Sequence, residues 1–282
     1  MSNADLKIGL ALGGGGAKGL AHIAMLEVFD ELHIRPHRMA GTSIGAVLGA
    51  LYASGLKASQ IREGVQRMII SKGDSFKAAL KKKDVLKWLQ FMDLEFRGHA
   101  IFKGDRFIEF LFSAMDIATF EALPIPLRIV ATDFWASKQV VLETGELLPA
   151  VKASMGLPGV FTPVAINNRV LIDGGGVNPV PHDLLLDCDV VVAIDVMGTP
   201  QDEGKKMPNL FRAVLTTFDI MQNSIIKEKL EKHPPTLYIK PKIQGVDILD
   251  FYKANEVYAQ AKPAQSNLRD QLKRLLSLDK AP

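Results

Sequence analysis

Leu12 to Leu26, LGGGGAKGLAHIAML, carries four consecutive glycines directly into a helical pattern. The preceding residues, Lys7 to Leu12, form a short apolar run that predicts a β-strand. From Gly19 to His33, apolar residues recur at three- and four-residue steps, which predicts an amphipathic helix. The chain therefore opens with a strand, a glycine-rich turn and a helix, the order in which an α/β fold begins.

The glycine loop allows three interpretations. It can be a tight strand-to-helix turn, although four glycines exceed what such a turn needs. The spacing Gly14-x-Gly16-x-x-Gly19 also matches a dinucleotide-binding loop, which needs an acidic residue about 20 residues further on. Residues 34–39 contain no acidic residue, although an arginine there suits a 2′-phosphate, and a Walker loop is excluded because no lysine follows Gly19. The third interpretation is an oxyanion hole, in which backbone amides face a developing negative charge.

The candidate nucleophile is Ser43, which lies in the motif Gly41-Thr42-Ser43-Ile44-Gly45. A GxSxG motif between a strand and a helix is typical of a nucleophile elbow, where Gly41 and Gly45 relieve crowding around the serine. We expect the strand at residues 38–41 and the helix at 46–54. In a right-handed βαβ unit, the glycine loop and Ser43 lie at the same carboxyl edge of neighbouring strands.

The candidate base is Asp173, which comes after a predicted hairpin over residues 164–172. Gly174 and Gly175 come directly after it, and glycines let a backbone approach another loop closely. The alternative is an ordinary Asp-Gly turn. A Ser-His-Asp triad is less favoured, because His233 lies in a polar turn and neither His182 nor His22 has a strong claim.

The rest of the chain alternates strand and helix patterns. Strands are predicted at 127–134, 139–142, 190–196 and 236–239, and helices at 210–232 and 255–278. Such alternation indicates an α/β fold, with a mainly parallel sheet covered by helices on both faces. We expect one domain over residues 1–282, with a helical insertion or lid at about 71–122.

The predicted insertion combines aromatic residues with lysines. Lys81, Lys82, Lys83 and Lys87 lie close to Trp88 in the sequence. One interpretation is peripheral contact with a membrane surface, in which apolar side chains enter the lipid and lysines meet anionic headgroups. The other is a helix packed on the domain with its lysines in solvent.

Composition narrows the class of protein. The 282 residues include 34 basic and 31 acidic side chains, a formal charge of +3, and no long basic tract, so nucleic acid is not an expected partner. Cys188 is the single cysteine, which excludes an intramolecular disulfide, favours a reducing compartment and argues against a cysteine-ligated metal. No early segment resembles a signal peptide and none is apolar enough to span a membrane, so a cytoplasmic location is expected.

Taken together, the glycine loop, the GxSxG motif and the Asp173-Gly174-Gly175 triplet resemble the patatin-like phospholipase family. Residues 153–163, ASMGLPGVFTP, resemble the segment that precedes the aspartate in that family, and Asn178-Pro179-Val180-Pro181 resembles the family's segment after the aspartate. The resemblance covers about residues 7 to 200, and bacterial members are the most similar in size.

The resemblance implies a three-layer α/β/α sandwich and a serine acyl hydrolase of the phospholipase, lysophospholipase or esterase type. It implies Ser43 as nucleophile and Asp173 as base, without histidine, metal or cofactor. The amides around Gly14, Gly15 and Gly16 are then the oxyanion hole, and Lys18 occupies a position that is basic in the family. Acyl-ester lipids are the implied substrates. A dinucleotide-binding protein and a non-catalytic regulatory member of the fold remain as alternatives.

Overall fold

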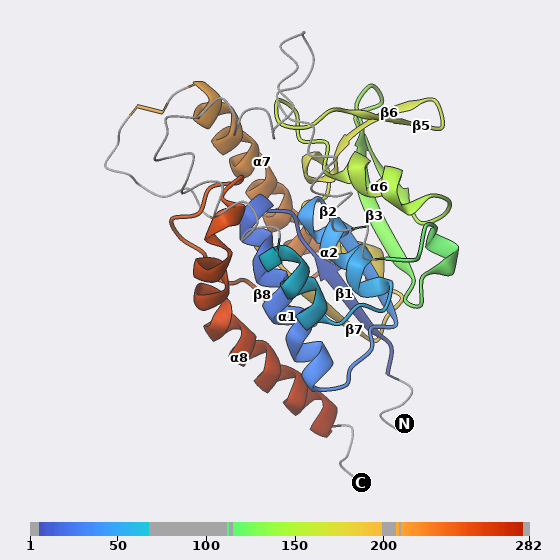
Figure 1. Cartoon of the computed structure of the whole chain (residues 1–282), viewed down its shortest axis with the longest axis vertical. Coiled ribbons are helices and arrows are strands. Elements are labelled where there is room, and N and C mark those ends of the chain that lie inside the picture. The colour runs from blue at the N-terminus through green and yellow to red at the C-terminus, as the bar shows by residue number, and fades with distance from the viewer. Residues whose placement is uncertain (1–5, 68–111, 113–114, 199–206, 209, 279–282) are drawn as a thin grey trace.

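The computed structural model describes residues 6–67, 112, 115–198, 207–208 and 210–278, and is centred on a single mixed sheet (Figure 1). The strand order is β5-β6-β3-β2-β1-β7-β8, and β4 pairs with β3 as well. The strands are β1 (Ile8–Leu12), β2 (Arg38–Thr42), β3 (Leu127–Asp133), β4 (Lys138–Leu142), β5 (Val164–Ile166), β6 (Arg169–Asp173), β7 (Val190–Ile194) and β8 (Leu237–Ile239).

Five neighbouring strands, β3, β2, β1, β7 and β8, run parallel to one another, so the prediction of a mainly parallel sheet is confirmed. All residues of the central strands β1 and β7 are buried, as expected for strands covered on both faces. The glycine loop follows β1 and Ser43 follows β2. Because β1 and β2 are adjacent and parallel, both features lie at the carboxyl edge of the sheet.

Helices cover both faces, which confirms the three-layer α/β/α arrangement. The helices are α1 (Ala21–Glu31), α2 (Ile44–Ala53), α6 (Leu147–Ser154), α7 (Leu210–Lys232) and α8 (Ala254–Leu278). One face packs against α1, α2, α6 and α8 in the main core. On the other face, Ile226 of α7 packs with Ala11, Ala40 and Val191 of the sheet. Within the described part of the chain, no helix is both long and apolar enough to cross a membrane.

Two features differ from the sequence-based expectations. The glycine loop enters α1 through a 3₁₀ turn, η1 (Gly16–Leu20), rather than directly. Helix α6 was not expected, since it is short and contains Pro149; a proline in the first turn is tolerated because that N–H has no partner within the helix. The insertion expected at 71–122, with its lysines, lies outside the described residues except for 112 and 115–122.

The start of α2 packs closely against the carboxyl ends of β1 and β2. A Cβ at Gly45 would overlap the carbonyl oxygen of Leu12, and a Cβ at Gly41 would lie 2.6 Å from the carbonyl oxygen of Gly45. One turn further on, a Cβ at Gly49 would make an ordinary contact of 3.5 Å with Leu127. Gly41 and Gly45 therefore set how near the nucleophile elbow comes to the glycine loop.

We predict that Gly45→Ala lowers the free energy of unfolding by about 3 kcal/mol or more. The new methyl group would overlap the backbone carbonyl of Leu12, and backbone cannot move aside as a flexible side chain can. Gly49→Ala, in the same helix, is the matched control. It should raise stability by up to about 1 kcal/mol through helix propensity. Urea denaturation followed by circular dichroism measures both, and equal effects of the two substitutions would contradict the close-packing account.

Candidate active site

The edge of β3 brings Ser43 and Asp173 together. Strand β4 pairs with residues 129–133 on one edge of β3, so β2 and β6 share the other edge. There Thr42 pairs with Val130, and Asp173 pairs with the next residue, Ala131. Because β2 and β6 run in opposite directions, their carboxyl ends meet on this edge. Ser43 follows Thr42 directly and therefore lies beside Asp173.

Ser43 occupies a strained backbone position at the N-terminus of α2. Its φ of 54° and ψ of −125° lie in a region that residues other than glycine rarely adopt. The Ser43 N–H donates to the hydroxyl of Ser154 at 2.8 Å, and that hydroxyl donates to the carbonyl of Val130 at 2.6 Å. The elbow is thus tied to β3 through Ser154, and the positive end of α2 lies beneath the serine.

Asp173 is held from several directions. Its side chain and backbone are only 3% exposed. Its N–H donates to Gly156 at 3.0 Å, and its carbonyl accepts from the Thr132 hydroxyl at 2.7 Å. Its carboxylate oxygen Oδ1 accepts the N–H of Gly175 at 2.7 Å. The carboxylate is therefore fixed in position before any substrate binds.

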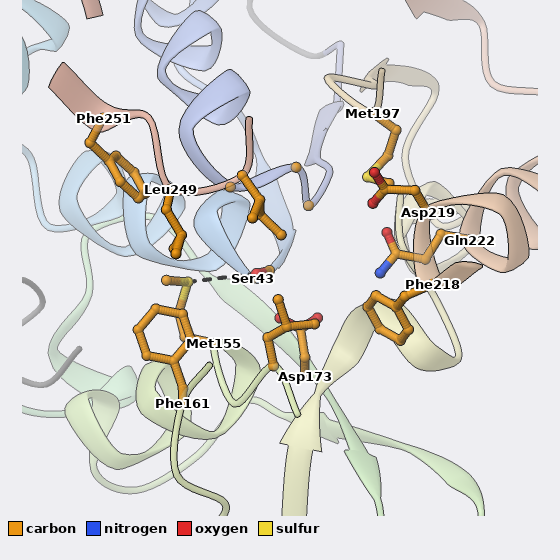
Figure 2. Close-up of a pocket in the computed structure, with 15 residues that line it drawn as sticks. Ser43, Met155, Phe161, Asp173, Met197, Phe218, Asp219, Gln222, Leu249 and Phe251 are labelled. Carbon is orange, nitrogen blue, oxygen red and sulfur yellow. Dashed lines mark hydrogen bonds between the residues drawn. The ribbon is translucent and has the colours of Figure 1, made fainter. Parts of the chain in front are cut away.

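Burial raises the pKa of Asp173 to about 6, and hydrogen bonds from the Gly175 N–H and the Ser43 hydroxyl oppose this rise. A carboxylate with a raised pKa is a stronger base than an exposed aspartate. The Ser43 hydroxyl also lies 3.6 Å from the sulfur of Met155, the contact drawn as a dashed line in Figure 2. The Ser43 hydroxyl therefore lies beside both the carboxylate of Asp173 and the thioether of Met155.

We predict that Asp173→Asn stabilises the protein at pH 8. A folded-state pKa of about 6 against 3.8 means that ionising Asp173 costs the folded state on the order of 3 kcal/mol. This cost is absent below the unfolded pKa, develops as the pH rises through about 4 to 6, and is complete above that. The variant should therefore gain stability over the wild type at pH 8 and lose that gain at pH 4.

Chemical denaturation at the two pH values measures the difference, and Asp270→Asn, at an exposed position on α8, is the control. An Asp173→Asn variant whose advantage is the same at pH 4 and pH 8 would show that the carboxylate is not destabilised by burial.

The glycine loop presents amides to the same space. The N–H of Gly14 donates to the carbonyl of Pro179 at 2.9 Å and is not available to a ligand. Gly15 and Gly16 have φ of 149° and 56°, and no described residue accepts a hydrogen bond from either N–H. Of the three expected donors, the N–H of Gly14 is thus paired within the protein, whereas those of Gly15 and Gly16 are unpaired among the described residues.

The two buried histidines near the site, His22 and His182, contact backbone carbonyl oxygens. Burial lowers the pKa of His22 to about 4, so the ring is neutral, and its Nε2 lies 2.8 Å from the carbonyl oxygen of Gly13. His22 therefore helps to hold the backbone of the glycine loop in place through Gly13. Both ring nitrogens of His182 face backbone carbonyls, those of Val180 and His233, at 2.9 Å. Neither ring lines the pocket that contains Ser43.

That pocket has two unlike sides, with Ser43 and Asp173 between them (Figure 2). One side is apolar and comes from the segment that follows α6 and the segment that precedes α8. The other side comes mainly from α7 and includes the polar residues Asp219 and Gln222. The residues of the apolar side that Figure 2 labels are Met155, Phe161, Leu249 and Phe251, and Leu157 and Ile248 also line the pocket.

The other predicted motif residues shape the surroundings of the site. A Cβ at Gly19 would overlap the side chain of Ile44, so Gly19 lets η1 approach α2. A Cβ at Gly174 would overlap the carbonyl oxygen of Val130, and Gly174 thus allows the close approach to β3. The side chain of Lys18 passes over Gly198, and its charge acts on Asp219 of α7.

Sequence reasoning did not assign Ser154, Asp219 or Gln222 to the site. Ser154 falls within the segment that resembles the patatin-like family, yet only its hydrogen bonds reveal its role. The two residues of α7 belong to an ordinary amphipathic helix, and no spacing in the sequence connects them with Ser43. Their place becomes visible only in the folded structure, where both line the pocket that contains Ser43.

Residues 10–186 match the family model described as patatin-like phospholipase. The chain belongs to the patatin-like phospholipase family. The matched range contains the glycine loop, Ser43 and Asp173, and it ends before α7. The elements that form the polar wall of the pocket thus lie outside the part that defines the patatin-like family.

Several curated relatives are longer proteins. An NTE family protein of Mycobacterium bovis is 30% identical over 225 residues, which are 76% of this chain and 58% of that protein. The neuropathy target esterase sws of Drosophila melanogaster is 34% identical over 69% of this chain and 13% of its own length. The lysophospholipase NTE1 of Coccidioides immitis is 28% identical over 94% of this chain and 18% of its own length. The patatin-like chain thus spans between about an eighth and three fifths of these relatives.

Among solved structures, VipD from Legionella pneumophila aligns with 93% of this chain and 67% of its own, at a TM-score of 0.47 and 13% identity. The effector protein ExoU aligns with 94% of this chain and 53% of its own, at a TM-score of 0.44 and 18% identity.

Proposed function

We propose that this protein is a serine acyl hydrolase that cleaves acyl esters of lipids, with Ser43 as nucleophile and Asp173 as base. The observation that carries the proposal is the meeting of β2 and β6 on β3, which sets a strained serine beside a buried carboxylate. Membership of the patatin-like phospholipase family supports the same chemistry. We further propose that residues 1–282 act as one domain, because α8 packs along α1 at the other end of the chain.

In the first half of the cycle, the Ser43 hydroxyl attacks the carbonyl carbon of the ester while Asp173 takes its proton. Two features of the site favour this step. The raised pKa of Asp173 increases its proton affinity, and the N-terminus of α2 stabilises the developing charge on the serine oxygen. For this step the hydroxyl donates its proton to the carboxylate of Asp173, not to the sulfur of Met155.

The tetrahedral intermediate carries a negative oxygen, which the amides of Gly15 and Gly16 are free to bind. Loss of one donor of this kind typically costs about 3 kcal/mol of transition-state stabilisation. When the intermediate collapses, the alcohol leaves with the proton held by Asp173, and an acyl-Ser43 ester remains. In the second half, Asp173 takes a proton from water while the hydroxide attacks the acyl carbon. When this second intermediate collapses, the Ser43 oxygen leaves and takes back the proton from Asp173, which releases the acid and restores both groups.

The substrate class is inferred from the pocket and the family. The apolar side of the pocket suits a fatty acyl chain, and one relative is named a lysophospholipase. Substrates of this kind lie in or on membranes, so we propose peripheral contact with a lipid surface during turnover, in a cytoplasmic setting. A dinucleotide-binding role remains as the alternative that the glycine spacing alone allows.

We predict that a fluorophosphonate probe labels the wild-type protein and that Ser43→Ala abolishes this labelling, because the probe reacts only with an activated serine. Ser54→Ala, which removes a hydroxyl just after α2, should label like the wild type. Mass spectrometry of the labelled peptide identifies the residue. Absence of labelling, combined with thermal stabilisation by a dinucleotide, would favour the alternative.

We predict that kcat/KM for a short-chain ester rises with pH through a midpoint near 6. Asp173 must be ionised to accept the proton, and burial places its pKa at about 6. The rate should fall about tenfold for each pH unit below that value, as for any single ionisation. Circular dichroism at each pH separates this titration from unfolding, and a rate that stays level down to pH 4 would exclude Asp173 as the base.

A further inference from the structure

Helix α7 points two polar side chains into the pocket that the proposed cycle does not use. Asp219 and Gln222 are three residues apart and so lie on the same face of the helix. Figure 2 shows both of them reaching from α7 toward the space in front of Ser43 and Asp173. The question is what these groups bind when the pocket is occupied.

Gln222 is the more informative of the two. It is only 6% exposed, and its amide makes no hydrogen bond to any described residue. Buried amides almost always have partners, so an unpaired one that faces a pocket points to a ligand. Its position is sterically defined, because a Cβ at Gly175 would overlap its Nε2 and lie 2.9 Å from Oδ1 of Asp173. Gly175, two residues after the proposed base, thus makes room for this amide.

Asp219 adds an acceptor next to the amide. Burial raises the pKa of Asp219, and the positive charge of Lys18 partly opposes that rise. Within the described residues its carboxylate accepts no hydrogen bond. Beside the apolar side chains of Phe218 and Met197, this wall therefore carries a carboxylate that accepts, an amide that both donates and accepts, and a nearby ammonium group.

The opposite side of the pocket is apolar, with Met155, Phe161 and Leu249 facing Ser43. An ester held at Ser43 has an acyl part and an alcohol part that leave the carbonyl carbon in different directions. If the acyl part takes the apolar side, the alcohol part lies against α7. Neutral hydroxyl groups suit that wall, because each one both donates and accepts hydrogen bonds.

We propose that Asp219 and Gln222 bind the alcohol part of the substrate and select alcohols that keep free hydroxyl groups close to the ester, such as a glyceryl group. This inference rests on the proposed acyl hydrolase function. It makes α7 a specificity element: Gln222 pairs with a hydroxyl near the ester, and Asp219 accepts from a hydroxyl further along the alcohol.

The test compares two esters of the same acid, glyceryl monodecanoate and propyl decanoate, whose alcohols have the same carbon chain. The ratio of their kcat/KM values is measured for the wild type, Gln222→Leu and Asp219→Asn. We expect the wild type to favour the glyceryl ester by about tenfold or more, the effect of one hydrogen bond to a buried group. Gln222→Leu, similar in volume, should remove about tenfold of that ratio, and Asp219→Asn about threefold.

Ser224→Ala is the matched control, because Ser224 lies on an exposed part of α7 and should leave the ratio unchanged. Fluorophosphonate labelling of Ser43 in each variant reports whether the nucleophile is intact. A wild type without preference for the glyceryl ester, or variants that retain the wild-type ratio, would overturn the role of α7 while leaving the hydrolase standing. Failure to hydrolyse either ester, without labelling of Ser43, would overturn both.

Discussion

The pairing along one edge of β3 is the constraint on which the site depends. Two strands from distant parts of the chain end against consecutive residues, Val130 and Ala131, and so their last residues meet. The same stretch of β3 also anchors the elbow through Ser154 and the base through Thr132. A slip of one residue in either pairing would turn Ser43 or Asp173 toward the other face of the sheet.

The proposed base, Asp173, is a carboxylate, where a Ser-His-Asp triad has a histidine. A carboxylate in water is a poor base toward a hydroxyl, but burial of Asp173 increases its proton affinity without a second ring to relay the proton. The buried histidine His22 lies with its Nε2 at 2.8 Å from the carbonyl oxygen of Gly13 and does not line the pocket. Burying the ionised Asp173 thus costs the folded protein stability, whereas the contact between His22 and Gly13 stabilises the glycine loop.

The sequence predicted most elements of the fold, because strand and helix periodicities are local and Gly41, Gly45 and Gly174 sit where backbones touch. It also indicated Ser43 and Asp173 through their motifs, although their roles stay predictions. It could not show that the N–H of Gly14 is taken by Pro179, because that bond depends on how distant loops cross. The polar residues of α7 could not be assigned to the pocket for the same reason. The position of Gln222 beside Ser43 and Asp173 depends on how α7 packs, which its own sequence does not indicate.

A hydrogen bond from the N–H of Ala17 to the carbonyl of Ile248, at 2.8 Å, joins the segment after the glycine loop to the C-terminal part of the chain. The family range ends at residue 186, yet the walls around Ser43 draw on α7 and on the loop at 248–251. In the proposed hydrolase, the reacting groups therefore lie within the family range, whereas the wall proposed to select the alcohol lies beyond it. Such a division lets mutation alter which esters enter while the reacting groups stay untouched, so that one ancestral hydrolase can give rise to descendants with different substrate ranges.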